Sequence, residues 1–140
     1  MIRRATADDV EEIVAIFEPS FALLEFLPQL HTHDENVAFF RRCVQEGEAY
    51  LLGRGFAILA GDWLTHLYVH PDELGTGVGH TLFDHATKLR PGGFQFWVFQ
   101  QNEHARRFYE AHGALAVEFT DGEGNEEKTP DVRYEWTPSA

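Results

Sequence analysis

LYVHPDELGTGVG, at residues 67–79, is the stretch that decides the fold. Its first residues are apolar, aromatic or β-branched and predict a strand, and the apolar residues after Gly79 recur at helical spacing. Three glycines in five residues therefore join a strand to a helix, where backbone N–H groups and the positive end of a helix dipole point at one spot. This arrangement predicts an anion-binding loop, although a glycine run alone is equally typical of a flexible turn.

Two common phosphate-binding loops do not fit this segment. A Walker loop needs Gly-Lys followed by Ser or Thr, and the chain contains no such run. A Rossmann fingerprint needs G-x-G-x-x-G after the first strand. Here the spacing is G-x-G-x-G, His80 stands in place of the third glycine, and the strand is the fourth. The loop therefore belongs to neither class.

The rest of the chain predicts one mixed α/β domain over residues 1–140. Apolar periodicity and capping residues indicate helices that start after Thr6, at Asn36, at about Gly79 and after Asn102. We expect Pro19 to end the first helix, and a short helix and loop to fill residues 20–33. The predicted strands are residues 1–5, 49–52, 56–59, 63–69, 94–99, 115–119 and 132–136.

Composition excludes several classes of function. The 140 residues carry eleven Lys and Arg against twenty-three Asp and Glu, a net charge of −12. This balance argues against binding to nucleic acid or to anionic membranes, and it would attract a cationic substrate. The single cysteine, Cys43, cannot form an internal disulfide, and the chain shows neither a membrane-spanning run nor a secretory leader. We expect a cytoplasmic protein, with a homodimer left open.

A second constellation follows the strand at residues 94–99. Asn102 and Tyr109 are seven residues apart on the predicted helix, about two turns, so their side chains lie on one face. Ala105 between them leaves room for a ligand, and Gly113 ends the helix. By themselves, these residues could equally form the buried apolar face of a helix that packs on the core.

Together the two segments resemble the GNAT family of N-acetyltransferases. Residues 67–71 and the loop that starts at Gly75 are similar to the family's motif A, and the Asn102 to Gly113 helix is similar to its motif B. The resemblance implies a single-domain acyl-CoA N-acyltransferase fold: a mixed, mostly antiparallel sheet of six to seven strands flanked by about four helices. Leu74 and Thr76 depart from the family pattern because they stand where a Gln or Arg and a second cation are common. Weaker cofactor binding is therefore expected.

The resemblance also implies roles for individual residues. Acetyl-CoA would be the cosubstrate, with its diphosphate on the glycine loop and its pantetheine arm between the strands at residues 67–69 and 97–100. Tyr109 would act as the general acid that protonates the leaving thiolate. The implied cofactor-binding residues are Leu67, Tyr68, Val69, Leu74, Gly75, Thr76, Gly77, Val78, Gly79, His80, Asn102, Ala105 and Phe108.

The general base is not supplied by the resemblance. Many relatives carry a Glu on the fourth strand where this chain has Trp63, which we expect to line the acceptor pocket. Strand alternation places His66 on the face opposite Trp63, so His66 is either a base or a packed structural residue. His31 on the loop between the early helices and Glu25 are further candidates for the base or the acceptor site, and Asp62 lies nearby in the sequence.

These observations predict an N-acetyltransferase acting on a primary amine, either a small cationic amine or a peptide amino group. A non-catalytic acyl-CoA-binding sensor is the main alternative. The cluster of His31, His33, Asp34 and Glu35 could also be read as metal ligands, but its spacing lacks the later ligand of a known site, and no metal is expected.

Overall fold

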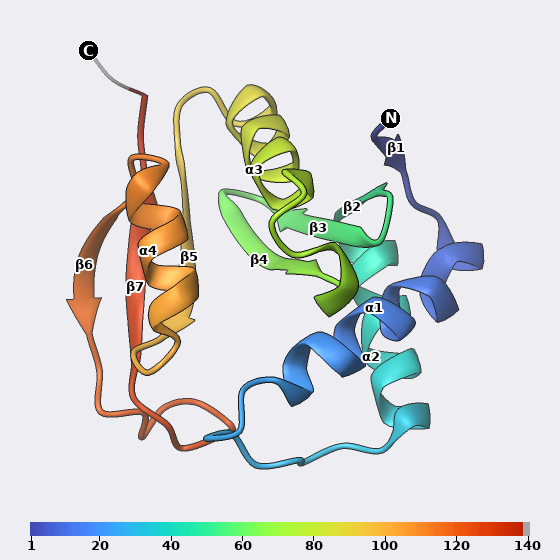
Figure 1. Ribbon diagram of the computed structural model, residues 1–140, viewed down its shortest axis with the longest axis horizontal. Coiled ribbons are helices and arrows are strands. Elements are labelled where there is room, and N and C mark those ends of the chain that lie inside the picture. The colour runs from blue at the N-terminus through green and yellow to red at the C-terminus, as the bar shows by residue number, and fades with distance from the viewer. Residues whose placement is uncertain (139–140) are drawn as a thin grey trace.

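The computed structural model describes residues 1–138, so the last two residues of the expected domain lie outside it. It is a seven-stranded sheet in the order β1-β2-β3-β4-β5-β7-β6 with four α-helices (Figure 1). This is the architecture expected from the sequence. The strands are β1 (Arg3–Arg4), β2 (Glu48–Leu52), β3 (Gly55–Ala60), β4 (Trp63–Val69), β5 (Phe94–Phe99), β6 (Leu115–Phe119) and β7 (Asp131–Trp136), and the helices are α1 (Val10–Ala22), α2 (His33–Glu46), α3 (Val78–Leu89) and α4 (Glu103–Ala111).

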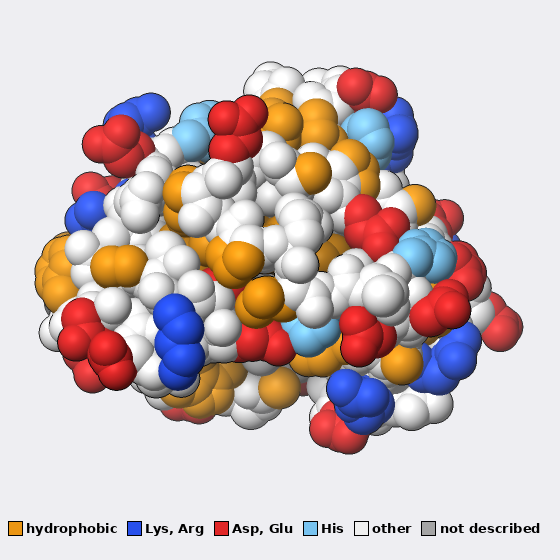
Figure 2. All heavy atoms as spheres, turned by 90° about the horizontal axis from the view of Figure 1, so that it is seen from below, with side chains coloured by type: hydrophobic (Ala, Val, Ile, Leu, Met, Phe, Trp, Pro, Cys, Tyr) orange, Lys and Arg blue, Asp and Glu red, His pale blue; other side chains and the backbone are white. Residues whose placement is uncertain are grey.

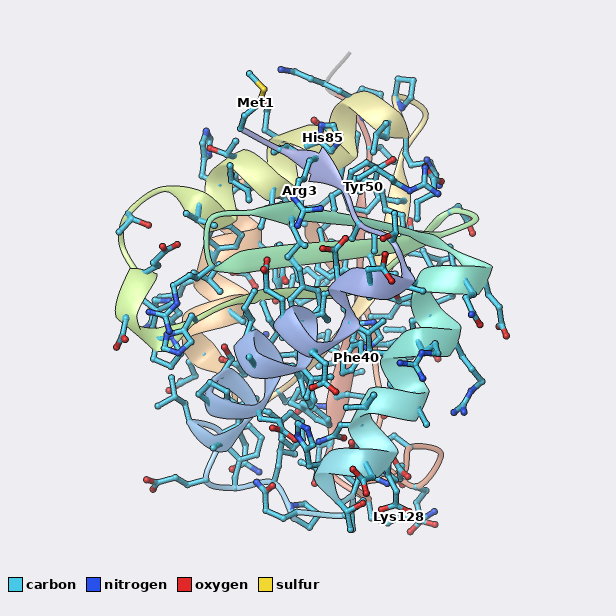
Figure 3. All side chains as sticks on the ribbon, turned by 90° about the vertical axis from the view of Figure 1, so that its right-hand side faces the viewer. Met1, Arg3, Phe40, Tyr50, His85 and Lys128 are labelled. Atoms are coloured by element: carbon cyan, nitrogen blue, oxygen red, sulfur yellow. The ribbon has the colours of Figure 1, made fainter. Side chains whose placement is uncertain are left out.

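Alternation along β3 divides the core between the two faces of the sheet. Phe56 and Ile58 join the buried cluster of α1 and α2, whereas Ala57 and Leu59 join the cluster of α3 and the carboxyl-terminal strands. Such a strand is buried on both sides, which explains why residues 56–59 are a continuous apolar run. In Figure 3, Phe40 of α2 lies between the two early helices, where it is fully buried.

Helix α1 runs through Pro19 to Ala22, so the expectation that Pro19 ends it is wrong. A proline in the last turn removes only one backbone hydrogen bond, and other contacts hold this turn. The rings of Phe17 and Phe21, one turn apart, have centroids 5.1 Å apart. The Ser20 hydroxyl lies 2.7 Å from the carbonyl oxygen of Ile16 and 2.8 Å from that of Val69, which ties the turn to the end of β4.

A β-bulge in β4 changes which side chains share a face. Ile58 pairs with His66 and Leu59 pairs with Leu64, so Thr65 is an extra residue. Because Ala60 pairs with Trp63, Trp63 and His66 both lie on the face of Ile58. The prediction that His66 lies opposite Trp63 is therefore wrong, since it assumed unbroken alternation.

Strands β4 and β5 are parallel neighbours joined by α3, and they pair only at Trp63 and Gln95. Beyond that pair they separate, and the backbone edges of residues 65–69 and 97–99 face each other across a gap. The other neighbouring strands of the sheet are antiparallel. Over residues 1–138, no helix is both long and apolar enough to cross a bilayer.

Candidate active site

The glycine loop lies between β4 and the start of α3, as the sequence predicts, and the structure adds the conformation of its backbone. Gly75 and Gly77 have φ angles of +82° and +93°, in the left-handed region that favours glycine. Helix α3 starts directly after Gly77, so the N–H groups of Val78, Gly79 and His80 lack partners within the helix. A Cβ at Gly75 or Gly77 would meet no atom within 4 Å, so the loop is open to an approaching anion.

Gly79 serves packing between helices. A Cβ there would lie 3.5 Å from the Phe108 ring, which packs over the start of α3 and against Phe83. The Nδ1 of His80 lies 2.7 Å from Nε2 of His112, and Nδ1 of His112 lies 2.7 Å from the Phe108 carbonyl oxygen. Phe108 and His80, both expected to bind cofactor, thus join α3 to α4 and do not line the cleft described next.

A cleft of about 590 Å³ occupies the gap between β4 and β5, and we call it the strand cleft. The Asn102 side chain caps α4 by accepting a hydrogen bond from the Ala105 N–H at 3.2 Å. Both residues line the cleft, as does Tyr109 one turn further along α4. Of the other residues expected to bind cofactor, those that line it are Leu67, Tyr68, Val69 and Leu74.

The Tyr109 phenol lies at the inner wall of this cleft. Burial raises its pKa far above the ordinary value, and the neighbouring Tyr68 raises it further. Its ring packs on Phe96, with centroids 4.4 Å apart. The hydroxyl therefore stays protonated at neutral pH and can donate a hydrogen bond to a group in the cleft.

A second pocket of about 630 Å³ lies between α1, α2 and the loop that joins β6 to β7, and we call it the acidic pocket. Its walls include aromatic rings of α1, α2 and β4, and four carboxylates surround it: Glu18, Glu35, Glu126 and Glu127. Figure 2 views the molecule from below and shows acidic and histidine side chains beside hydrophobic ones on that face. The two pockets share His66, Tyr68 and Phe99.

The acidic pocket is closed on one side by two loops that are far apart in the sequence. Nε2 of His31, before α2, lies 2.7 Å from a carboxylate oxygen of Glu126, in the loop between β6 and β7. This hydrogen bond raises the pKa of His31. The meeting of the two loops is visible in Figure 1, and Lys128 of the second loop lies near the lower end of α2 in Figure 3.

His66 lines both pockets, but its surroundings suit a neutral, packed ring. Its centroid is 5.0 Å from that of Phe40 and 5.6 Å from that of Phe39. Burial lowers the pKa of His66 to about 4, so it is uncharged at neutral pH and only a weak base.

Three residues expected near the acceptor lie elsewhere. Trp63 pairs with Gln95 at the start of β4 and lines neither pocket, Asp62 contacts the Gln95 side chain, and Glu25 is exposed outside both. Within residues 1–138, no group of three acidic, histidine or cysteine side chains is arranged to hold a metal ion.

Sequence reasoning missed two sets of pocket residues. His104 and Arg107 of α4 line the strand cleft. They place an imidazole and a guanidinium group at the cleft, whereas residues 74–79 of the glycine loop include no Lys or Arg. Glu126 and Glu127 lie in a polar loop, and the sequence gives no local sign that Glu126 contacts His31, about 95 residues earlier in the chain.

Comparisons with known proteins agree with this geometry. Residues 34–113 match the family model described as an acetyltransferase (GNAT) domain. The chain is 32% identical over 120 residues to the peptidyl-lysine N-acetyltransferase YjaB of Escherichia coli strain K12, covering 80% of each protein.

Solved structures give the same result for the fold. The solution structure of apo-form YjaB from Escherichia coli superimposes with a TM-score of 0.78 at 27% identity, covering 99% of this chain and 98% of that one. PaiA N-acetyltransferase from Thermoplasma acidophilum, solved in complex with coenzyme A, has a TM-score of 0.74 at 15% identity, covering 99% of this chain and 98% of that one. The chain belongs to the GNAT family of acetyl-CoA-dependent N-acetyltransferases.

Proposed function

We propose that the protein transfers the acetyl group of acetyl-CoA to a primary amine on a lysine-like side chain or a small cationic amine, with Tyr109 as the general acid. One observation carries this proposal: a cleft between diverging strands, containing Tyr109, adjoins an acidic pocket through His66, Tyr68 and Phe99. A thioester held in the cleft would present its carbonyl at this junction. The name of the similar YjaB protein, a peptidyl-lysine N-acetyltransferase, supports an amine of this kind.

The residues of the chain suit the binding of acetyl-CoA. The open glycine loop and the free N–H groups of α3 offer donors to a diphosphate, and Arg107 adds a cation at the strand cleft. The unpaired edges of β4 and β5 offer backbone groups to an extended arm. Acetyl-CoA supplies the activated acyl group, and the protein positions it.

The transfer reaction requires a group that can protonate the departing thiolate, and we assign this role to Tyr109. A neutral amine attacks the thioester carbonyl, a C–N bond forms, the C–S bond breaks, and the departing thiolate gains a proton. Tyr109 stays protonated, so it can stabilise the developing negative charge on sulfur with a hydrogen bond and deliver its proton. The ammonium form first loses one proton to water, at a cost of about 5 kcal/mol at pH 7 for a group with a pKa of ~10.4, and the nitrogen releases a second proton to water as the amide forms.

Replacement of Tyr109 by Phe tests the mechanism. We expect kcat for thiol release from acetyl-CoA, in the presence of a lysine peptide, to fall about 100-fold because a general acid contributes at least that much. The dissociation constant of coenzyme A should change less than threefold by calorimetry, since the ring remains. Tyr50→Phe is the matched control, because its hydroxyl bonds to Glu48 at 2.9 Å outside both pockets. An unchanged kcat in Tyr109→Phe removes Tyr109 from the mechanism.

The same assay tests the reaction itself. Thiol release should depend on the amine, and mass spectrometry should show one acetyl group added to the acceptor. Tight coenzyme A binding with no amine-dependent turnover across a panel of amines would instead identify a sensor.

A further inference from the structure

The four carboxylates of the acidic pocket differ in what they contact. Glu18 lies 3.0 Å from His33 Nδ1 and accepts a hydrogen bond from the Asn36 amide. Glu35 accepts the Thr32 N–H at 2.8 Å, as part of the cap of α2. Glu126 is paired with His31. Each of these three carboxylates is therefore already engaged by the protein.

Glu127 is different. Among residues 1–138, its carboxylate has no ion pair and no side-chain hydrogen bond, although it lines the acidic pocket. It acts on the Tyr68 phenol, whose pKa rises to about 12 mainly through burial and then through the negative charge of Glu127. The Tyr68 hydroxyl also has no hydrogen-bond partner in the described chain, and Tyr68 lines both pockets. An unpaired carboxylate and an unpaired phenol thus line the same pocket, and Tyr68 also belongs to the junction with the strand cleft.

Hydrogen bonds of neighbouring residues hold the backbone of the loop that carries Glu127. The Asn125 side chain bridges the loop by donating to the Thr129 carbonyl oxygen at 2.7 Å and accepting the Thr129 N–H at 3.1 Å. Lys128, directly after Glu127, has a φ of +52°, and its Nζ donates to the Glu123 carbonyl oxygen at 2.7 Å. A left-handed conformation is uncommon for a lysine, and these hydrogen bonds hold the backbone on either side of Glu127, which places its Cα at the pocket.

We propose that Glu127 is the specificity-determining residue for the acceptor, and that its carboxylate binds the positively charged group of a lysine-like side chain beside Tyr68. This inference rests on the proposed transfer to an amine. The aromatic walls suit the aliphatic stem of a lysine and can also attract its charge, and they include Phe17, Phe21, Phe39, Phe40 and Phe99. Carboxyl groups are in general about six pKa units more acidic than lysine-like ammonium groups, so binding suits a carboxylate better than deprotonation.

A comparison of peptide affinities distinguishes recognition of the lysine charge from recognition of the side-chain shape. The probes are a short peptide with one central lysine and blocked ends, and the same peptide with norleucine, titrated into the coenzyme A-saturated protein. We expect the lysine peptide to bind more tightly than the norleucine peptide. In Glu127→Gln, affinity for the lysine peptide should fall about tenfold, as for a lost hydrogen bond to a charged group, with no change for norleucine. Glu123→Gln is the matched control, because Glu123 lies in the same loop, is exposed and lines neither pocket.

Steady-state kinetics of the same variants provide a second test of the role of Glu127. Glu127→Gln should raise KM for the lysine peptide about tenfold and leave kcat within threefold of wild type, and Glu127→Asp, which keeps the charge, should recover part of the loss. Equal affinity of wild type and Glu127→Gln for the lysine peptide overturns the inference. A fall in kcat at constant KM also overturns it, because Glu127 would then act on the reaction and not on binding. Absence of acetyl transfer by the wild-type protein defeats the proposed function, whereas the peptide titration still decides the role of Glu127.

Discussion

At Gly77 the backbone conformation, and not the space around the residue, requires glycine. Its φ of +93° lies in the left-handed region, while an added Cβ would contact nothing within 4 Å. At Gly79 the space around the residue matters and the backbone angles do not, because the backbone is helical and the Phe108 ring packs against it. The sequence predicted a glycine loop correctly, but it could not distinguish these two physical causes.

Replacement of Gly77 by Ala should therefore destabilise the protein by about 1–2 kcal/mol, the cost of a left-handed conformation for a residue with a Cβ. Urea unfolding measures the change. Gly124→Ala is the control, because Gly124 has no left-handed φ and also has open space around it. Equal stabilities for the two variants would show that the loop relaxes freely and that Gly77 is not constrained.

At the scale of elements, the ends of the helices were partly predictable. The capping box of Thr6 and Asp9 and the cap by Asn102 follow from local sequence, and both are present. The end of α1 was not predictable because it depends on the Ser20 contact with Val69, 49 residues away. The β4 bulge depends likewise on pairing with β3, so the placement of His66 required the structure.

The start of α2 matters for the acidic pocket, because the pocket lies beside its first turns. The Thr32 hydroxyl accepts the Glu35 N–H at 3.2 Å and the Glu35 carboxylate accepts the Thr32 N–H, which makes a second capping box. Thr32→Ala should cost about 1 kcal/mol in urea unfolding, and Thr32→Ser should stay within a few tenths because it keeps the oxygen. Similar losses in both variants would mean that the methyl group, and not the cap, stabilises the helix.

At the scale of the whole molecule, His66 makes stability depend on pH. Its pKa is lowered to about 4 in the folded protein, below the usual 6.5, so the unfolded chain binds more protons between these values. The ring is surrounded by Phe39, Phe40, Tyr68 and the hydroxyl of Thr65, none of which is negatively charged at these pH values. The contribution of His66 to the free energy of unfolding should therefore fall as pH decreases from 6.5 to 4.

The comparison of wild type with His66→Gln isolates this effect. We expect the difference in free energy of unfolding between the two proteins to change through the pH range 6.5 to 4, always in favour of the variant at lower pH. His31 and His33 have raised pKa values, so they act in the opposite sense, but they are common to both proteins. The exposed histidine variant His104→Gln serves as control. A constant difference across this range would show that His66 is protonated as easily in the folded state as in the unfolded one.

The single pairing between Trp63 and Gln95 has a mechanical consequence. Strands β1 to β4 form one part of the sheet and β5 to β7 form the other. Backbone pairing joins the two parts only at Trp63 and Gln95, and the hydrophobic core that includes α3 packs against both. An extended arm of acetyl-CoA, bound in the strand cleft as proposed, would form hydrogen bonds with backbone groups of both β4 and β5. Binding there would join the two parts of the sheet and stabilise the folded state, so the stability of the fold would depend on whether the strand cleft is occupied.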